Sequence, residues 1–270
     1  MAIEAVESVE LQQDVVCGRA GARDLLCDIY RPAPAQTKRT AVIHLHGGGF
    51  LRGNKAGARM ARPLAELGYT CVSSSYRLAD EAAWPAQIHD VKTCIRWVRT
   101  HAGSLDVAAN RVVLLGYSAG ARLTVIAGGT QNEPSLEGDG GLPGVGTQIA
   151  ACVAFYPPAV TRRSHPVLGP EPSEEAIRTF SPIEQVKPGF PPTMLLHGTA
   201  DTMVAVDESV QLYQALRQAG APVELHVVEG MTHVFDSHAD VAAACGEWID
   251  LFLDRHVVNP RAYPSTEPAR

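Results

Sequence analysis

The 270-residue sequence has few aromatic residues and no excess of basic ones. Aromatic side chains make up 6% of the sequence, and 23 Lys and Arg stand against 29 Asp and Glu, for a formal net charge of -6. Nucleic-acid binding needs a basic surface against the phosphates, so this balance argues against a nucleic-acid partner. No apolar run is long enough to cross a bilayer, so we expect no membrane span.

The sequence also has little that is typical of a secreted protein. Residues 1–11 are acidic and lack the apolar core of a secretory signal, which favours a cytoplasmic location. The six cysteines include no C-x-x-C pair, so we expect reduced, buried thiols. A disulfide between Cys17 and Cys27, which lie close in the sequence, stays open as an alternative.

Short apolar runs alternate with amphipathic stretches along the sequence. The apolar runs predict strands at residues 41–45, 70–74, 112–115, 149–155, 193–196 and 223–228. Most are apolar almost throughout, which is typical of parallel strands that are covered on both faces. Apolar stripes at helical spacing predict helices at residues 60–67, 88–98, 121–127, 210–216 and 241–252.

This alternation predicts an α/β fold, in which a mostly parallel, doubly wound sheet carries helices on both faces. We expect one domain over residues 1–258, with antiparallel edge strands near its start and no large cap domain. Residues 259–270 are expected to form a loose tail. The glycine-rich segment 128–146 is predicted as a loop, and the proline-rich segment 157–192 as a loop with one short helix.

The strongest motif is G-x-S-x-G at residues 116–120, with Ser118 at its centre. It follows a predicted strand and precedes a predicted helix, the context in which such a serine stands on a sharp turn above the sheet. The helix N-terminus behind it favours negative charge that develops during nucleophilic attack. We therefore predict that Ser118 is a nucleophile, the alternative being a glycine turn with a surface serine.

A second glycine motif, HGGGF at residues 46–50, follows the strand predicted at residues 41–45. Glycines there allow backbone amides to approach a ligand closely and to point at it. Gly48, Gly49 and the amide of Ala119 are therefore predicted to form an oxyanion hole, the alternative being a turn that only ends the strand. His46 is expected to shape the loop rather than to take part in catalysis.

A nucleophilic serine needs a base, and the base needs a carboxylate that orients it. Asp201 and His233 follow two predicted strands, in the order serine, acid, histidine that this kind of site uses. We predict that they complete the triad. Asp236 and His238 are weaker alternatives, because they lie close to the last predicted helix.

Further sequence blocks accompany these motifs: SYRLA at 75–79, WPAQIHDVKTCIRWVRTHA at 84–102 and PPTMLLHGTADTMV at 191–204. Together they resemble the compact carboxylesterases related to hormone-sensitive lipase and to the feruloyl-esterase-like (BD-FAE-type) group. The resemblance implies the α/β-hydrolase fold, the triad and oxyanion hole given above, and a reaction without a cofactor. Tyr117 stands where the lipase-like branch usually carries Asp, which favours the compact branch.

The predicted function is hydrolysis of small, short-acyl carboxylic esters through an acyl-enzyme. The small-molecule ester is the expected partner, and a homo-oligomer is left open. Bulky residues that flank the predicted catalytic residues in sequence are expected to shorten the acyl pocket: Phe50, Leu51, Tyr117, Tyr156 and Val204.

Four other functions stay open. The same fold carries arylformamidases and other amidases, and also feruloyl and acetyl-xylan-type esterases. A metal hydrolase built on His44 and His46 is disfavoured, because no third ligand follows at close spacing. A ligand receptor on an inactive hydrolase fold is disfavoured because all three triad residues are present.

Overall fold

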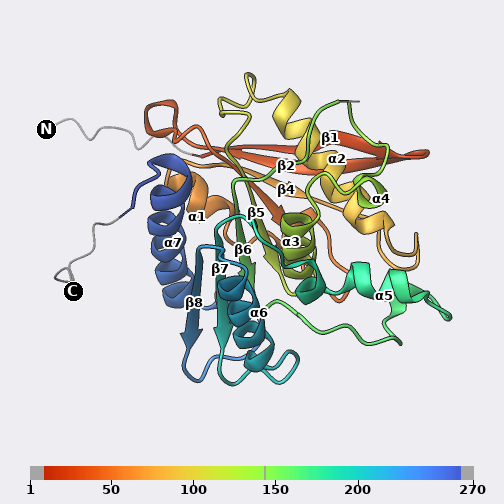
Figure 1. The fold of residues 1–270 in the computed structure, drawn as a ribbon. Coiled ribbons are helices and arrows are strands. Elements are labelled where there is room, and N and C mark those ends of the chain that lie inside the picture. The colour runs from red at the N-terminus through yellow and green to blue at the C-terminus, as the bar shows by residue number, and fades with distance from the viewer. Residues whose placement is uncertain (1–8, 143, 263–270) are drawn as a thin grey trace, which may run out of the picture.

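The computed structural model of the protein describes residues 9–142 and 144–262. The centre of this part is an eight-stranded sheet with the strand order β1-β2-β4-β3-β5-β6-β7-β8 (Figure 1). Strands β3 to β8 run parallel, whereas β1 and β2 form an antiparallel pair at one edge. The strands are β1 (Glu10–Ala20), β2 (Arg23–Arg31), β3 (Ala41–Leu45), β4 (Thr70–Ser74), β5 (Val112–Tyr117), β6 (Ala151–Phe155), β7 (Thr193–Gly198) and β8 (Val223–Val228).

Helices cover both faces of the sheet (Figure 1). They are α1 (Ala61–Glu66), α2 (Ala86–Thr100), α3 (Ala119–Gly129), α4 (Pro134–Glu137), α5 (Glu174–Phe180), α6 (Val206–Gln218) and α7 (Ala239–Leu253). Consecutive strand residues point to opposite faces, so Ile43 packs in one apolar cluster with α2, α3 and α6. Val42 packs in the other cluster, with α1 and α7. This arrangement confirms the predicted doubly wound α/β fold, and no large cap covers the sheet in the described part of the chain.

The strand boundaries agree closely with the sequence pattern. Strands β3, β4 and β8 have the predicted limits, whereas β5 and β7 each continue two residues further, to Tyr117 and Gly198. Strand β6 begins later than predicted, at Ala151. The reason is that the amide of Ile149 donates to the side-chain oxygen of Gln131, 3.1 Å away, instead of to a neighbouring strand.

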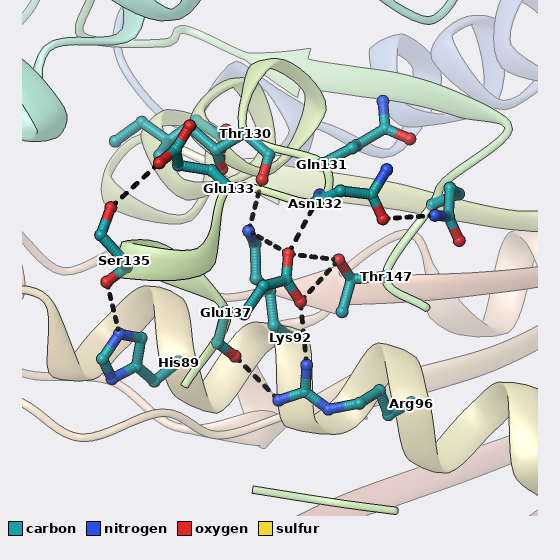
Figure 2. Close-up of polar contacts among 12 residues, drawn as sticks. His89, Lys92, Arg96, Thr130, Gln131, Asn132, Glu133, Ser135, Glu137 and Thr147 are labelled. Carbon is teal, nitrogen blue, oxygen red and sulfur yellow. Dashed lines mark hydrogen bonds and ion pairs between the residues drawn. The ribbon is translucent and has the colours of Figure 1, made fainter. Parts of the chain in front are cut away.

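The prediction of a plain loop over residues 128–146 is wrong, because α4 forms inside it. Glu137, at the end of α4, binds two cations of α2 (Figure 2). Its carboxylate lies 2.8 Å from the Lys92 ammonium and 3.0 Å from the Arg96 guanidinium. Lys92 is almost fully buried, so this contact fixes the segment against α2 and allows one helical turn to form.

All six cysteines are buried free thiols, so Cys17 and Cys27 are not bridged in this structure. No helix in the described ranges combines the length and the apolar composition that a membrane crossing requires. At the start of the predicted tail, the Asn259 side chain forms a local hydrogen bond to Asp254 over 2.7 Å. Residues 263–270 of that tail, and residues 1–8 of the acidic N-terminal stretch, lie outside the described part.

Candidate active site

The predicted catalytic residues all lie at the carboxyl edge of the parallel strands, where sheets of this kind build their sites. Ser118 joins β5 directly to α3, Asp201 follows β7, and His233 follows β8. The backbone of Ser118 has φ 51° and ψ -111°, a conformation that non-glycine residues rarely adopt. Such strain is held only by the surrounding structure, and it is often found at functional sites.

The two glycines of the serine motif allow the turn to pack tightly. A Cβ on Gly116 would lie 2.2 Å from the backbone oxygen of Gly120. A Cβ on Gly120 would lie 2.0 Å from the backbone oxygen of Leu45, at the end of β3. Any side chain at either position would therefore push α3 away from the sheet and displace Ser118.

His233 and Asp201 form a direct hydrogen bond. The Nδ1 atom of His233 lies 2.6 Å from Oδ2 of Asp201. The other carboxylate oxygen accepts the backbone amides of Met203 and Val204, at 2.9 and 3.0 Å. Burial alone would raise the pKa of Asp201, but these amides and His233 outweigh it and hold the pKa below its usual value. The carboxylate is therefore ionised at neutral pH and keeps a fixed orientation towards the histidine.

A second histidine, His197, contacts the same carboxylate, and the sequence gives it no role. Its Nε2 atom lies 3.2 Å from Oδ2 of Asp201 and 3.0 Å from the backbone oxygen of Val204. Its Nδ1 atom lies 2.7 Å from the hydroxyl of Ser209. Burial lowers the pKa of His197, which keeps the ring neutral. Its signal in the sequence is its position four residues before Asp201, at the end of a strand.

The glycine loop after β3 turns sharply at Gly48 and Gly49, which have φ values of 112° and 64°. The backbone oxygen of Gly48 accepts the amides of Leu51 and Arg52. A Cβ on Gly48 would lie 2.0 Å from the backbone oxygen of Arg52, whereas one on Gly49 would meet nothing within 4 Å. A side chain at position 48 would therefore have no space. At both positions the positive φ also favours glycine.

His46 lies under this loop. Its ring stacks on Tyr76 with 4.1 Å between centroids, and the Tyr76 hydroxyl donates to the His46 backbone oxygen over 2.7 Å. Burial lowers the pKa of His46 to about 4 and that of His44 to about 3. Both rings are therefore neutral at neutral pH. Among the described residues, no three metal-binding side chains gather around these rings or anywhere else.

Two cavities meet at Ser118, and His233, Gly49 and Met203 also border both. The first, which we call the arginine cavity, has a volume of about 380 Å³. Its other lining residues include Phe50, Ala119, Arg122, Val160, Arg162, His165, Val204 and Glu208. The second, the glycine-loop cavity, has a volume of about 670 Å³. Its lining includes Gly48, Leu51, Asn54, Arg59, Tyr117 and Tyr156.

The five residues predicted to line the pocket are thus divided between the cavities. Phe50 and Val204 border the arginine cavity, and Leu51, Tyr117 and Tyr156 border the glycine-loop cavity. Leu51 is 60% exposed at the rim, whereas both tyrosines are almost fully buried and also belong to the apolar core.

Tyr156 connects His233 to an ion pair between Arg59 and the buried Asp236. Its ring lies 4.3 Å from the His233 ring, and its hydroxyl donates to Asp236 over 2.6 Å. Arg59 binds both the Tyr156 hydroxyl and the Asp236 carboxylate. The carboxylate of Asp236 is thus occupied by Arg59 and Tyr156, while Asp201 is the acid that contacts His233.

The parallel sheet, the strained serine turn and the loops at its carboxyl edge define an α/β-hydrolase. The BD-FAE family model matches residues 27–216. The chain belongs to this family, which confirms the resemblance in its sequence motifs.

Curated relatives and solved structures agree with this assignment. Esterase LipC of Mycobacterium tuberculosis is 30% identical over 239 residues, covering 78% of this chain and 57% of LipC. Esterase LipQ of the same organism is 32% identical over 262 residues, covering 88% of this chain and 62% of LipQ. The chain thus spans less than two thirds of either relative.

Two solved structures are similar over nearly their whole length. A truncated carbohydrate esterase from gut microbiota has a TM-score of 0.81 and 26% identity, covering 92% of this chain and 97% of that one. Thermogutta terrifontis esterase 2 phosphorylated by paraoxon has a TM-score of 0.77 and 27% identity, covering 95% of this chain and 98% of that one. Both are esterases with the same compact architecture.

Proposed function

We propose that this protein is a serine carboxylic-ester hydrolase with Ser118, His233 and Asp201 as its triad. The observation that carries the proposal is the 2.6 Å hydrogen bond between His233 and Asp201, beside cavities that Ser118 and His233 both border. Asp201 holds the His233 Nδ1 proton, which leaves Nε2 as the base for the Ser118 hydroxyl. Esterase relatives and the phosphorylated structural neighbour support the same chemistry.

The reaction has two halves. Ser118 Oγ bonds to the ester carbonyl carbon while His233 takes its proton, and the amides of Gly48, Gly49 and Ala119 stabilise the oxyanion. The bond from the carbonyl carbon to the alcohol oxygen then breaks, and His233 returns the proton to the leaving alcohol. Water repeats these steps on the acyl-enzyme and releases the acid and Ser118, without a cofactor.

A paraoxon-labelling experiment tests the nucleophile. We expect mass spectrometry to find one diethyl phosphate group, on the peptide that contains Ser118, with loss of ester hydrolysis in proportion to labelling. The variant Ser118→Ala should take up no label and should lose nearly all turnover while it folds normally. Ser135→Ala, at an exposed serine of α4, is the matched control and should keep both. Turnover in purified Ser118→Ala similar to that of the unaltered protein would refute the proposal.

The cavities favour short acyl groups. The Tyr117 hydroxyl accepts the backbone amide of Met60, and the Tyr156 hydroxyl donates to Asp236, so their rings form a fixed wall of the glycine-loop cavity. We expect kcat/KM on 4-nitrophenyl esters to be highest between acetate and hexanoate. A maximum at decanoate or longer would overturn the short-acyl preference. The matching 4-nitroanilides should be much poorer substrates, and an anilide preferred over its ester would make the protein an amidase.

A further inference from the structure

Arg122 lies one helical turn after Ser118 and is 3% exposed. Its guanidinium donates to the Thr161 hydroxyl and the Phe180 backbone oxygen, at 2.8 and 3.1 Å. It also donates to the backbone oxygen of Val160 at 2.8 Å, and it lies over the Phe180 ring. All of these acceptors are neutral, and the buried Nε atom has no hydrogen-bond partner among the described residues.

This arrangement differs from that of three other arginines whose side chains are partly or mostly buried. They pair with carboxylates: Arg59 with Asp236, Arg77 with Asp90 and Arg96 with Glu137. Arg122 has no carboxylate at ion-pair distance in residues 9–142 and 144–262. Burying an unpaired charge is costly, so a positive charge kept beside a cavity favours a ligand that brings the negative one.

The other charged groups around the arginine cavity leave a positive balance. Arg162 is exposed on its rim and forms no ion pair with a described residue. Glu208 is the carboxylate in the lining, and it accepts the backbone amides of Ala159 and Val160 at 2.7 and 2.9 Å. Its charge therefore already stabilises two backbone donors.

Two histidines also border this cavity. His165 packs against Phe50 and Phe180, and burial lowers its pKa to about 4, so it adds no positive charge at neutral pH. His233 is the proposed base, which works in its neutral form. Apart from His233, the cavity therefore presents two guanidinium groups against one carboxylate.

We infer that the arginine cavity binds a carboxylate carried by the substrate. One half of the ester, the acyl group or the alcohol, enters this cavity. The preferred substrates are then esters that carry a carboxylate on that half. Guanidinium groups suit this role because their planar set of donors matches a carboxylate. This inference rests on the proposed ester hydrolysis, since the cavity selects among esters only if Ser118 attacks them.

Two pairs of esters test the inference, each with a carboxylate in one member and a neutral amide of similar size in the other. For the alcohol half the pair is 4-carboxyphenyl acetate and 4-carbamoylphenyl acetate. For the acyl half it is 4-nitrophenyl hydrogen adipate and 4-nitrophenyl adipamate, with spontaneous hydrolysis subtracted. In one pair we expect kcat/KM for the acid to exceed that for the amide by about tenfold, the size of one charge-assisted hydrogen bond.

The ratio of kcat/KM for the acid to kcat/KM for the amide should respond to substitutions around the cavity, rising with some and falling with others. Arg162→Gln removes a positive charge and should lower the ratio. Glu208→Gln removes the negative charge but keeps an oxygen for the two backbone amides, so it should raise the ratio. Arg163→Gln is the control, because Arg163 pairs with Glu174 and does not line the cavity, and it should leave the ratio unchanged. Arg122→Gln should lower the ratio most, in protein shown to be folded by circular dichroism.

Acid-to-amide ratios at or below one in both pairs would overturn the inference. A ratio above one that neither Arg162→Gln nor Glu208→Gln alters would overturn it as well. Both results leave ester hydrolysis intact. Failure of the proposed function looks different, because then no ester of either pair is hydrolysed, or Ser118→Ala hydrolyses them all.

Discussion

Two groups of buried cations in this protein differ in whether a carboxylate contacts them directly. Lys92 and Arg96 share the carboxylate of Glu137, which fixes a loop against α2 (Figure 2). No carboxylate of the described residues lies at ion-pair distance from Arg122, which borders a cavity beside Ser118. The difference teaches that a cation in direct contact with a carboxylate helps to hold the fold together, whereas a buried cation without such a contact, beside a cavity, can bind a ligand. Changes at the first group should therefore alter stability, and changes at the carboxyl edge should alter catalysis.

The largest effect is expected at Asp201. Asp201→Asn keeps an oxygen for the amides of Met203 and Val204, so the loop should stay folded, but it no longer fixes the Nδ1 proton of His233. We expect kcat to fall by about 10⁴-fold with a small change in Tm. Asp207→Asn, at an exposed acid in the first turn of α6, should keep normal kcat. A fall in kcat of less than tenfold in Asp201→Asn would mean that another acid orients His233.

The glycine loop offers a comparison between neighbours. Gly48→Ala should lower kcat by about 10²- to 10³-fold, because its Cβ would meet the Arg52 backbone and displace an oxyanion donor. Gly49→Ala has open space around its Cβ and should lower kcat by less than about tenfold, through backbone strain alone. Steady-state kinetics on 4-nitrophenyl acetate measure both. Equal losses of kcat in the two variants would show that the space around Gly48 does not decide the position of the oxyanion donor.

Glu137→Ala tests the first group, Lys92 and Arg96. It leaves the buried Lys92 without its carboxylate, and we expect the free energy of unfolding to fall by about 3 kcal/mol. The value of kcat below the unfolding transition should stay within about twofold, since α4 does not border either cavity. Urea denaturation gives the stability, and Glu133→Ala, at an exposed neighbour, should change it little. A large loss of kcat in folded Glu137→Ala would show that the contacts of Glu137 also affect catalysis.

The smallest effect is a dependence of stability on pH. Burial alone would raise the pKa of Glu137, but Lys92, Thr147 and Arg96 outweigh it and hold the pKa below its ordinary value of 4.5. A lowered carboxyl pKa gives stability that is complete above the ordinary value and is lost as the pH falls through the folded one. The difference in free energy of unfolding between the unaltered protein and Glu137→Gln should therefore narrow below pH 4.5. A constant difference would contradict this account.

The sequence predicts the parallel strands and the serine turn well, because each is encoded locally. Strand β3 is a mostly apolar run followed by His46 and three glycines, and its limits match the structure. The turn at Ser118 follows from two glycines at fixed spacing between a strand and a helix. Strand β6 starts later than its apolar run because Gln131, distant in sequence, binds the amide of Ile149.

Contacts between distant segments account for what the sequence does not predict. The turn of α4 depends on cations of α2, and glycines around it give a loop pattern. The sequence leaves Asp236 as an alternative acid, and the structure shows its carboxylate bound to Arg59 and Tyr156. Arg122 stands out because no carboxylate of the described residues lies at ion-pair distance from it, and only the fold shows this. Its one signal in the sequence is a charge within an otherwise apolar helix.

The backbone of Ser118 has a consequence for how such a protein would change if its reaction were no longer selected. With φ at 51°, any residue there except glycine carries a standing penalty of about 1 kcal/mol. A non-catalytic descendant that only bound ligands would gain stability by replacing this serine with glycine. A serine in a place where glycine is the more stable choice is therefore itself an argument that the hydroxyl is in use.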